Sequence, residues 1–439
     1  MEKWKGGDQM RKRVSFRLAS IILIFFLSCL LSSCGKKQVT NTNDKIIIRC
    51  VGYAHPQYDR FRKEQALSFE KINPKVKVNY DPVPGSGYSG RLMTQIVGDT
   101  APDIFFVPPG SVHDYSKRGA LLDLTPYLKK YAKSIDGIYS SIMRAVTFDG
   151  KVWALPGNAN TDALFYNRKL FREAGLPYPI EQLTWSELME PAKKLTKRDN
   201  RGRAIQFGAC LGNQWVLSMA FGPKLWSEDG KKSTINNPQM KEAIEYIKDL
   251  RYKYRIIPNQ ADFDAEGAIE MFGNNRIAMY PYQRWMTAVI REKENLDWAL
   301  APFPRGRKAT NWLSFNAIGV YAKTKYPEVA VDMLLHMISP DSIKHYIQFG
   351  DSIPIRNSGI EHSFFLNEPK RPKGENQVYL DGLEYALTTD DICHPNISYD
   401  EMNTIVWREV EAYWLGKVSA EIALAEAETK LNELLAQKQ

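Results

Sequence analysis

The chain has 439 residues, with 59 basic and 50 acidic side chains and a net charge of +9. Six basic and two acidic residues precede Cys34, so the remainder carries 53 basic and 48 acidic side chains, a net charge of +5 without long basic runs. This mild excess argues against nucleic-acid binding, and a remainder of about 400 residues predicts two lobes because one core rarely serves that length.

The amino terminus is predicted to be a signal peptide, residues 1–33. Basic residues at 11–13 and 17 precede the apolar stretch 18–31, which ends in Leu31-Ser32-Ser33-Cys34. A basic head, a short apolar middle and a small-residue exit are typical of secretion signals, and 14 residues reach only about 21 Å, too short for an ordinary membrane span. The last four residues resemble the bacterial lipobox, which implies cleavage before Cys34 and a lipid on Cys34. The alternative is an ordinary signal peptide with an incidental cysteine.

Residues 34–43 are polar and are predicted to be a tether. Strands and helices then alternate, which predicts an α/β fold with a largely parallel sheet. One helix is expected to end before Pro74 and another at Gly175, and Thr184 is expected to cap the start of a third. The predicted strands are 46–51, 76–80, 103–107 and 165–167; the predicted helices are 58–72, 91–97, 112–118, 170–174, 185–196, 238–254, 327–338 and 419–435.

Three stretches carry a family resemblance. They read GDTAPDIFF at 98–106 with GALLDLTPY at 119–127; GKVWALP at 150–156 with LFYNRKLF at 164–171 and AGLP at 174–177; and NRIAMY at 275–280 with Trp285 and APFP at 301–304. These resemble the extracellular solute-binding proteins of ABC importers, family 1, the sugar-binding group that includes the maltose-binding protein. Asn274-Asn275 replaces a glycine that the family prefers, and Pro281 interrupts the loop before Trp285.

The resemblance implies a type II periplasmic-binding-protein-like fold, with a ligand cleft between two α/β lobes joined by crossing segments. The crossings are expected near residues 153–156, 312–316 and 388–395. Lobe 1 would comprise 44–154 plus 313–388, and lobe 2 would comprise 155–312 plus 389–439. The implied function is capture of a carbohydrate, an oligosaccharide, and delivery to the transmembrane permease subunits of an ABC transporter. The chain would be a monomer, anchored on the extracytoplasmic face of the cell membrane of a Gram-positive-type surface.

A sugar site needs an aromatic platform with polar groups at its rim. By resemblance, Trp285 falls on the family's stacking tryptophan, and Trp215 on or next to another cleft aromatic; either could instead be a core residue. Tyr282 and Arg284 flank Trp285. Trp312 lies at an expected crossing and could equally pack the hinge.

Loops after strands supply the remaining candidates, because ligands bind beyond the carboxyl ends of strands. Gly110 and Ser111 follow strand 103–107, where the maltose-binding protein has charged ligand contacts, which puts maltose in doubt. Tyr53 and His55 follow the first strand. Asn158 and Asn160 offer amides that donate and accept, although turn formation is an alternative for both.

Other functions have weaker support in the sequence. A surface glycosidase would need a pair of carboxylates flanking the sugar, and no recognised motif supplies one. The same fold could bind a peptide, polyamine or phosphate ester. The G-x-G-x-x-G at 85–90 is a weak nucleotide signal, and the calcium-like run at 262–267 has Gly273 where a glutamate is required. Cys50, Cys210 and Cys393 suggest neither disulfides nor zinc. The chain is therefore expected to be a binding protein and not an enzyme, with no cofactor and no metal.

Overall fold

The computed structural model describes residues 45–54, 59–107, 110–369 and 373–438. Ile46–Gln439 forms one compact unit. The predicted signal peptide, the whole predicted tether with Cys34, and His55 lie outside the described residues. Within the described part of the chain, none of the helices combines the length and the apolar character that a membrane crossing requires.

A five-stranded sheet organises one half of the unit, in the order β2-β1-β3-β13-β6. Strand β1 (Ile46–Ala54) lies parallel to β2 (Val76–Pro84) and to β3 (Ile104–Val107). Strand β13 (Ala317–Val320) runs antiparallel to β3 and to β6 (Leu155–Pro156). All four residues of β3 are buried, as expected for a central strand covered on both faces.

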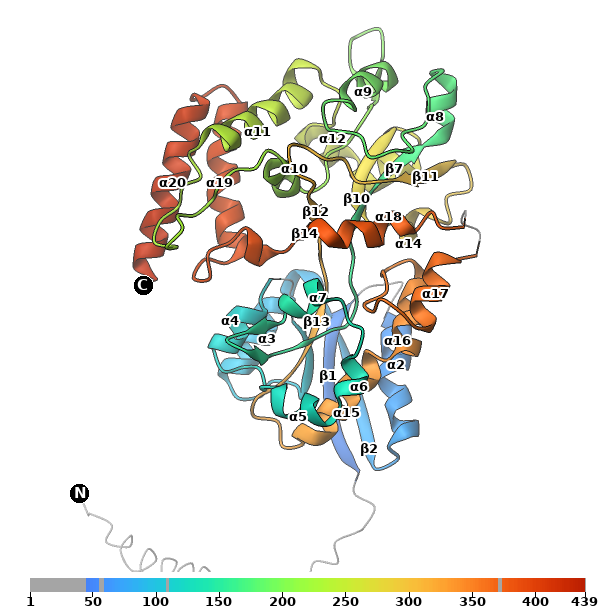
Figure 1. The fold of residues 1–439 in the computed structure, drawn as a ribbon, viewed down its shortest axis with the longest axis vertical. Helices are drawn as coiled ribbons and strands as arrows, with labels where there is room; N and C mark the ends of the chain where they lie inside the picture. Colours follow the sequence, from blue (N-terminus) through green and yellow to red (C-terminus); the bar gives the residue numbers. More distant parts are fainter. Residues whose placement is uncertain (1–44, 55–58, 108–109, 370–372, 439) are drawn as a thin grey trace, which may run out of the picture. The chain divides into compact units, whose positions relative to one another are not determined.

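Helices α2 (Asp59–Ile72), α3 (Tyr88–Val97) and α15 (Pro327–Met337) belong to this half of the unit (Figure 1). Helix α2 buries Phe61, Ala66 and Phe69 and ends just before Asn73-Pro74, since proline cannot continue a helix. Helix α15 contacts both α2 and β13. Residues on β1, α2 and α15 therefore share one hydrophobic core.

A three-stranded sheet organises the other half, with β7 (Asp162–Asn167) between β10 (Met279–Gln283) and β11 (Trp298–Ala301). Its side chains alternate between two cores. Leu164 and Tyr166 join a core shared with α10 (Gln214–Ala220), α11 (Pro238–Lys248), α19 (Tyr399–Trp414) and α20 (Ala420–Gln437). Phe165, from the opposite face, packs against Trp298 and Tyr379.

The expectation of a largely parallel sheet is wrong for most of the pairings. Both neighbours of β7 are antiparallel to it, and within the five-stranded sheet only the pairings of β1 with β2 and β3 are parallel. Strands β6 and β13 lie where the chain passes between the two sheets. The alternating sequence pattern predicts strand–helix–strand units, which would make these strands parallel to their neighbours. Their antiparallel direction follows instead from the passage of the chain between the sheets.

Three chain segments run side by side between the two sheets (Figure 1). Asn160 and Ser314 exchange backbone hydrogen bonds of 2.7 and 3.0 Å. Strand β12 (Asn311–Trp312) pairs in parallel with β14 (Ala386–Leu387), and Leu313 N donates to Leu387 O at 2.9 Å. The two sheets are thus joined by three adjacent strands rather than by a loose linker.

Candidate ligand-binding site

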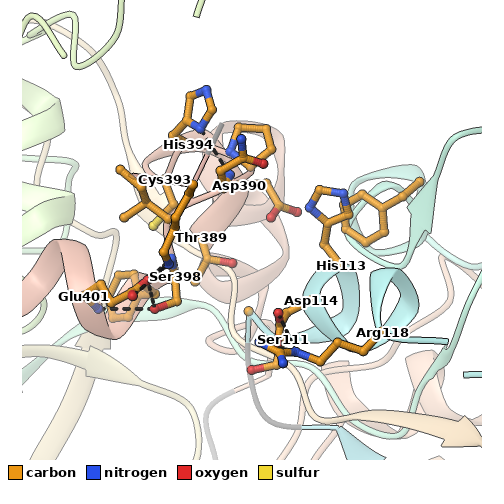
Figure 2. Close-up of a pocket in the computed structure, with 17 residues that line it drawn as sticks. Ser111, His113, Asp114, Arg118, Thr389, Asp390, Cys393, His394, Ser398 and Glu401 are labelled. Atoms are coloured by element: carbon orange, nitrogen blue, oxygen red, sulfur yellow. Dashed lines mark hydrogen bonds and ion pairs between the residues drawn. The ribbon is translucent and has the colours of Figure 1, made fainter. Parts of the chain in front are cut away.

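A cavity of about 400 Å³ opens between the residues after β3 and the segment that follows β14 (Figure 2). Gly110 and Ser111, two of the predicted contacts, form part of one wall, and Thr389 and Tyr399 form part of the other. Gly110 has φ +72°, and a Cβ there would lie 2.7 Å from a methyl carbon of Thr389. Only glycine tolerates both this backbone conformation and this close approach, so Gly110 brings the two walls together.

The cavity wall on the Gly110 side carries a flat surface. The ring of His113, on α4 (Val112–Lys117), stacks on Phe148 with ring centres 4.7 Å apart and planes 23° apart. Burial is the main cause that lowers the pKa of His113, which favours the neutral imidazole. Asp390 faces this ring from the opposite wall (Figure 2). The cavity therefore offers a planar face together with hydrogen-bonding groups, a combination suited to a small polar ligand.

Tyr399 connects the cavity to the joining strands. Its ring lies 5.8 Å from that of Trp312, whose side chain is buried at the start of the middle joining segment. Burial raises the pKa of Tyr399 to about 12, so the phenol is neutral and can donate a hydrogen bond. Trp312 thus connects the middle joining segment to one edge of the cavity through Tyr399.

The predicted asparagines form a buried polar network on the first joining segment. Asn158 donates to Asp351 Oδ2 at 3.1 Å and accepts from Asn316 N at 2.9 Å. Asn160 donates to the backbone oxygen of Asp351 at 2.9 Å. Its Oδ1 has no hydrogen-bond partner among the described residues, although the side chain is only 4% exposed. An unpaired buried acceptor is costly, so Asn160 can accept a ligand hydroxyl or a water, whereas the amide of Asn158 is already engaged.

Trp285 is half-buried and held in place. Its indole Nε1 donates to Gln283 Oε1 at 2.9 Å, and the same oxygen accepts from Ser314 Oγ at 3.0 Å. The ring of Tyr282 packs edge-on against it with centres 5.3 Å apart. Since Ser314 pairs with Asn160, the platform and the asparagine are connected through one joining strand.

Arg284 points away from any such platform. Its side chain has no exposed surface, and Nη2 lies 2.6 Å from Glu368 Oε2. Arg291 Nη2 lies 2.8 Å from the other carboxylate oxygen. Burial alone would raise the pKa of Glu368, but the field of Arg284 and the bond from Asn376 outweigh it and hold the pKa below its usual value. Arg284 therefore fixes the start of the segment that carries Trp285.

Trp215 lies inside the core shared by α10 and α19. It is 1% exposed, its Nε1 donates to Asn403 Oδ1 at 3.2 Å, and its ring lies 5.0 Å from that of Trp407. Asn213 caps α10 by accepting from Trp215 N. Tyr53 is half-buried at the end of β1, 4.1 Å from the ring of Tyr88, and its hydroxyl has no partner among the described residues.

Asp162 is the most unusual residue near the joining strands, and sequence reasoning missed it. Its side chain is 2% exposed, Oδ1 has no partner among the described residues, and burial raises its pKa to about 8. Its backbone is held by both amide atoms of Asn311. The sequence signal that could have identified Asp162 is its position as an acidic residue at the start of the largely apolar run 162–167. Gln283, Ser314 and Asn316 were also missed, since nothing local distinguishes them.

Two α/β lobes, three joining strands and a ligand-sized cavity beside them define a two-lobed solute-binding protein. A family model for the bacterial extracellular solute-binding protein matches residues 55–344, and the chain belongs to that family. This confirms the expected family and, because its members are binding proteins, the expectation that the chain is not an enzyme.

Known proteins similar to this chain agree with that assignment. The "Multiple sugar-binding protein" of Streptococcus mutans is 22% identical over 372 residues, covering 80% of this chain and 84% of that protein. An ABC substrate-binding protein of Listeria monocytogenes in complex with cycloalternan superposes with a TM-score of 0.78 at 24% identity, covering 90% and 100% of the two chains. A cyclic alpha-maltosyl-1,6-maltose binding protein of Arthrobacter globiformis gives a TM-score of 0.74 at 19% identity, covering 90% and 100%. These superpositions confirm the two-lobed fold.

Proposed function

We propose that the protein captures an oligosaccharide between its two lobes and delivers it to the permease of an ABC transporter. One observation carries this most: a half-buried tryptophan, Trp285, is fixed by Gln283 and tied through Ser314 to Asn160, which has a free acceptor. A rigid aromatic face suits the C–H face of a sugar, and a free amide oxygen suits its hydroxyls. The similar proteins of Streptococcus, Listeria and Arthrobacter are each named for sugars or complexed with one.

The site residues have different roles in this proposal. Trp285 and Tyr282 form the platform, with Asn160 and the Tyr53 hydroxyl at its rim. Gly110 and Ser111, with His113, line the cavity where the ligand reaches the other lobe. Arg284, Trp215 and Asn158 do not contact the ligand but stabilise the backbone around the site. Trp312 packs at the hinge.

Capture would proceed by closure of the lobes around the joining strands. The first body would carry the five-stranded sheet, including β6 (Leu155–Pro156), and the second body the three-stranded sheet. The chain around Glu368 and Tyr379, expected in lobe 1, would move with the second body, because Glu368 pairs with Arg284 and Tyr379 packs against Phe165. A ligand that contacts both bodies favours the closed form by its differential affinity. The closed form presents both lobes in a fixed relation, which is a shape that a permease can recognise.

The amino terminus would attach the protein to the membrane. Removal of residues 1–33 leaves Cys34 at the new amino terminus, where a lipid would anchor the protein to the outer face of the membrane. Residues 34–43 then act as a tether for a monomeric binding unit.

A thermal-shift screen of plant-cell-wall and starch oligosaccharides tests the function, followed by calorimetry on each ligand found. We expect one saturable site per chain and recovery of the sugar unchanged. If no sugar raises the thermal midpoint and a peptide, polyamine or phosphate ester does, the ligand is of that class and not a carbohydrate. Recovery of shortened sugar would contradict the binding function itself.

A further inference from the structure

Two short segments of lobe 2 are rich in basic residues. Residues 193–203 contain six lysines and arginines but one acid, Asp199, and residues 251–255 add Arg251, Lys253 and Arg255. The first group includes β8 (Lys197–Arg198) and the turn that leads into its hairpin partner β9 (Ala204–Gln206). The second group lies in and just after the π-helical turn Asp249–Lys253 that ends α11.

The two groups line one hollow of about 660 Å³. Five arginines share its lining: Arg198, Arg201, Arg203, Arg251 and Arg255. Two carboxylates share it as well, Asp262 and Glu411. Asp262 is already engaged, since it accepts from Asn259 N at 2.9 Å at the start of α12 (Gln260–Ala265). Because five arginines face two carboxylates, the lining carries a net positive charge.

Two of these arginines build the hollow. Arg198 donates to the backbone oxygens of Tyr254 and Arg255 at 3.3 and 2.9 Å, which ties the hairpin to the chain after α11. Arg203 bonds Asp199 at 2.8 Å within the hairpin. Arg198 thus holds the two groups of basic residues together, and Arg203 stabilises the hairpin.

The other arginines have spare hydrogen-bonding capacity. Within the described residues, Arg201 and Arg255 have no carboxylate at salt-bridge distance, and both are exposed. Arg251 lies over the ring of Trp414 at 4.8 Å, and its buried Nε has no hydrogen-bond partner among the described residues. Arg255 has φ +52°, an uncommon backbone conformation for a residue other than glycine. Holding unpaired cations close together is electrostatically unfavourable, unless an anion occupies the space between them.

We infer that this hollow is an anion site for a phosphate group, separate from the sugar cleft. A phosphoryl group carries up to two negative charges and three acceptor oxygens, so it can satisfy several guanidinium forks at once. A carboxylate has one charge and two oxygens and leaves part of this set unpaired. The phosphate can belong to a small solute or to a phosphodiester polymer, because the chemistry that the arginines recognise is the same.

The test is titration of inorganic pyrophosphate and, separately, of a poly(glycerol phosphate) chain into the purified protein at low ionic strength. The test variant is Arg201→Gln with Arg255→Gln. The matched control is Arg60→Gln, which removes a 90% exposed arginine on α2. We expect saturable binding by the wild type, about tenfold weaker binding by the double variant, and binding by the control within twofold of the wild type, as expected for loss of charge-assisted bonds at one site.

Unchanged thermal midpoints would confirm that the variants remain folded. Binding of pyrophosphate identifies a small phosphate as sufficient, and binding of the polymer alone identifies the polymer as the source. Absence of saturable binding for both probes, or equal affinity in the wild type and the double variant, would overturn the inference. Sugar binding is not a readout here, so this result stands independently of the proposed function.

Discussion

Arg284 Nη2 lies 2.6 Å from Glu368 Oε2, although the two residues are far apart in sequence and their side chains are 0% and 5% exposed. The pair joins the segment that carries Trp285 to the chain after α17 (Ile360–Leu366). It also holds a buried charge next in sequence to Trp285, with the guanidinium over the rings of Phe365 and Tyr379. Such a pair is strongly destabilising when only one partner is removed.

Glu368→Gln should therefore lower the free energy of unfolding by about 3–5 kcal/mol, because Arg284 is left buried without its carboxylate. Denaturant unfolding measures the loss. The double variant Arg284→Met with Glu368→Leu should recover much of it, since no buried charge remains at that position. A Glu368→Gln loss below about 1 kcal/mol would show that Arg284 is satisfied by other groups.

The same carboxylate predicts a dependence on acid. The folded pKa of Glu368 lies below its ordinary value of 4.5, so its contribution is complete above the unfolded pKa and is lost as the pH falls through the folded one. Stability measured from pH 6 downward should fall less steeply in Glu368→Gln than in the wild type. Parallel curves would contradict the role given to this carboxylate.

Asp162 predicts the opposite trend. Burial raises its pKa to about 8, so the folded chain keeps a proton that the unfolded chain releases above about pH 4. Its contribution is present at low pH and is lost as the pH rises toward 8. Asp162→Asn, which keeps the shape without the charge, should remove this loss and raise the stability at pH 8 by at least about 1 kcal/mol. A less stable variant at pH 8 would mean that Asp162 is ionised and paired.

Two tryptophans separate binding from folding. Trp285→Ala should weaken sugar binding by roughly 1–3 kcal/mol, as for loss of one large apolar contact, and leave the fold intact. Trp215→Ala, the matched control in the core, should lower the free energy of unfolding by about 3–5 kcal/mol. Calorimetry and denaturant unfolding on both variants distinguish the roles. Unchanged affinity with lowered stability in Trp285→Ala would make it a core residue.

The anchor is tested by Cys34→Ala. The variant should be released from membranes or stay unprocessed, because the lipid-bearing thiol is gone. Fractionation with detergent, followed by mass measurement of the amino terminus, reports both outcomes. A variant that is processed and still needs detergent would contradict the lipobox interpretation.

Local signals in the sequence were sufficient for much of the fold. Strand β1, helix α2 and its end before Pro74, and the buried run in β3 match the structure within a few residues. Helix α9 (Met189–Leu195) starts later than predicted, since Thr184 and Glu187 cap a separate turn before it. Helix α19 was missed entirely, although Ser398 and Glu401 form a capping box at its start.

The site was less predictable because its decisive contacts join distant residues. The sequence around Trp285 indicates an aromatic loop, but nothing local shows that Arg284 is turned inward to Glu368. The surroundings of Trp215 likewise do not show that its indole meets Asn403 in the core. Gly110 was predicted as a ligand contact, but the structure explains the need for glycine at this position by the close approach of Thr389.

The most direct test of the account is small-angle scattering of the protein with and without a saturating sugar found by thermal shift. Joining strands between two lobes predict closure on the ligand, so the radius of gyration should fall at saturation while the sugar is recovered intact. An unchanged radius of gyration at saturation would contradict capture by closure between the lobes.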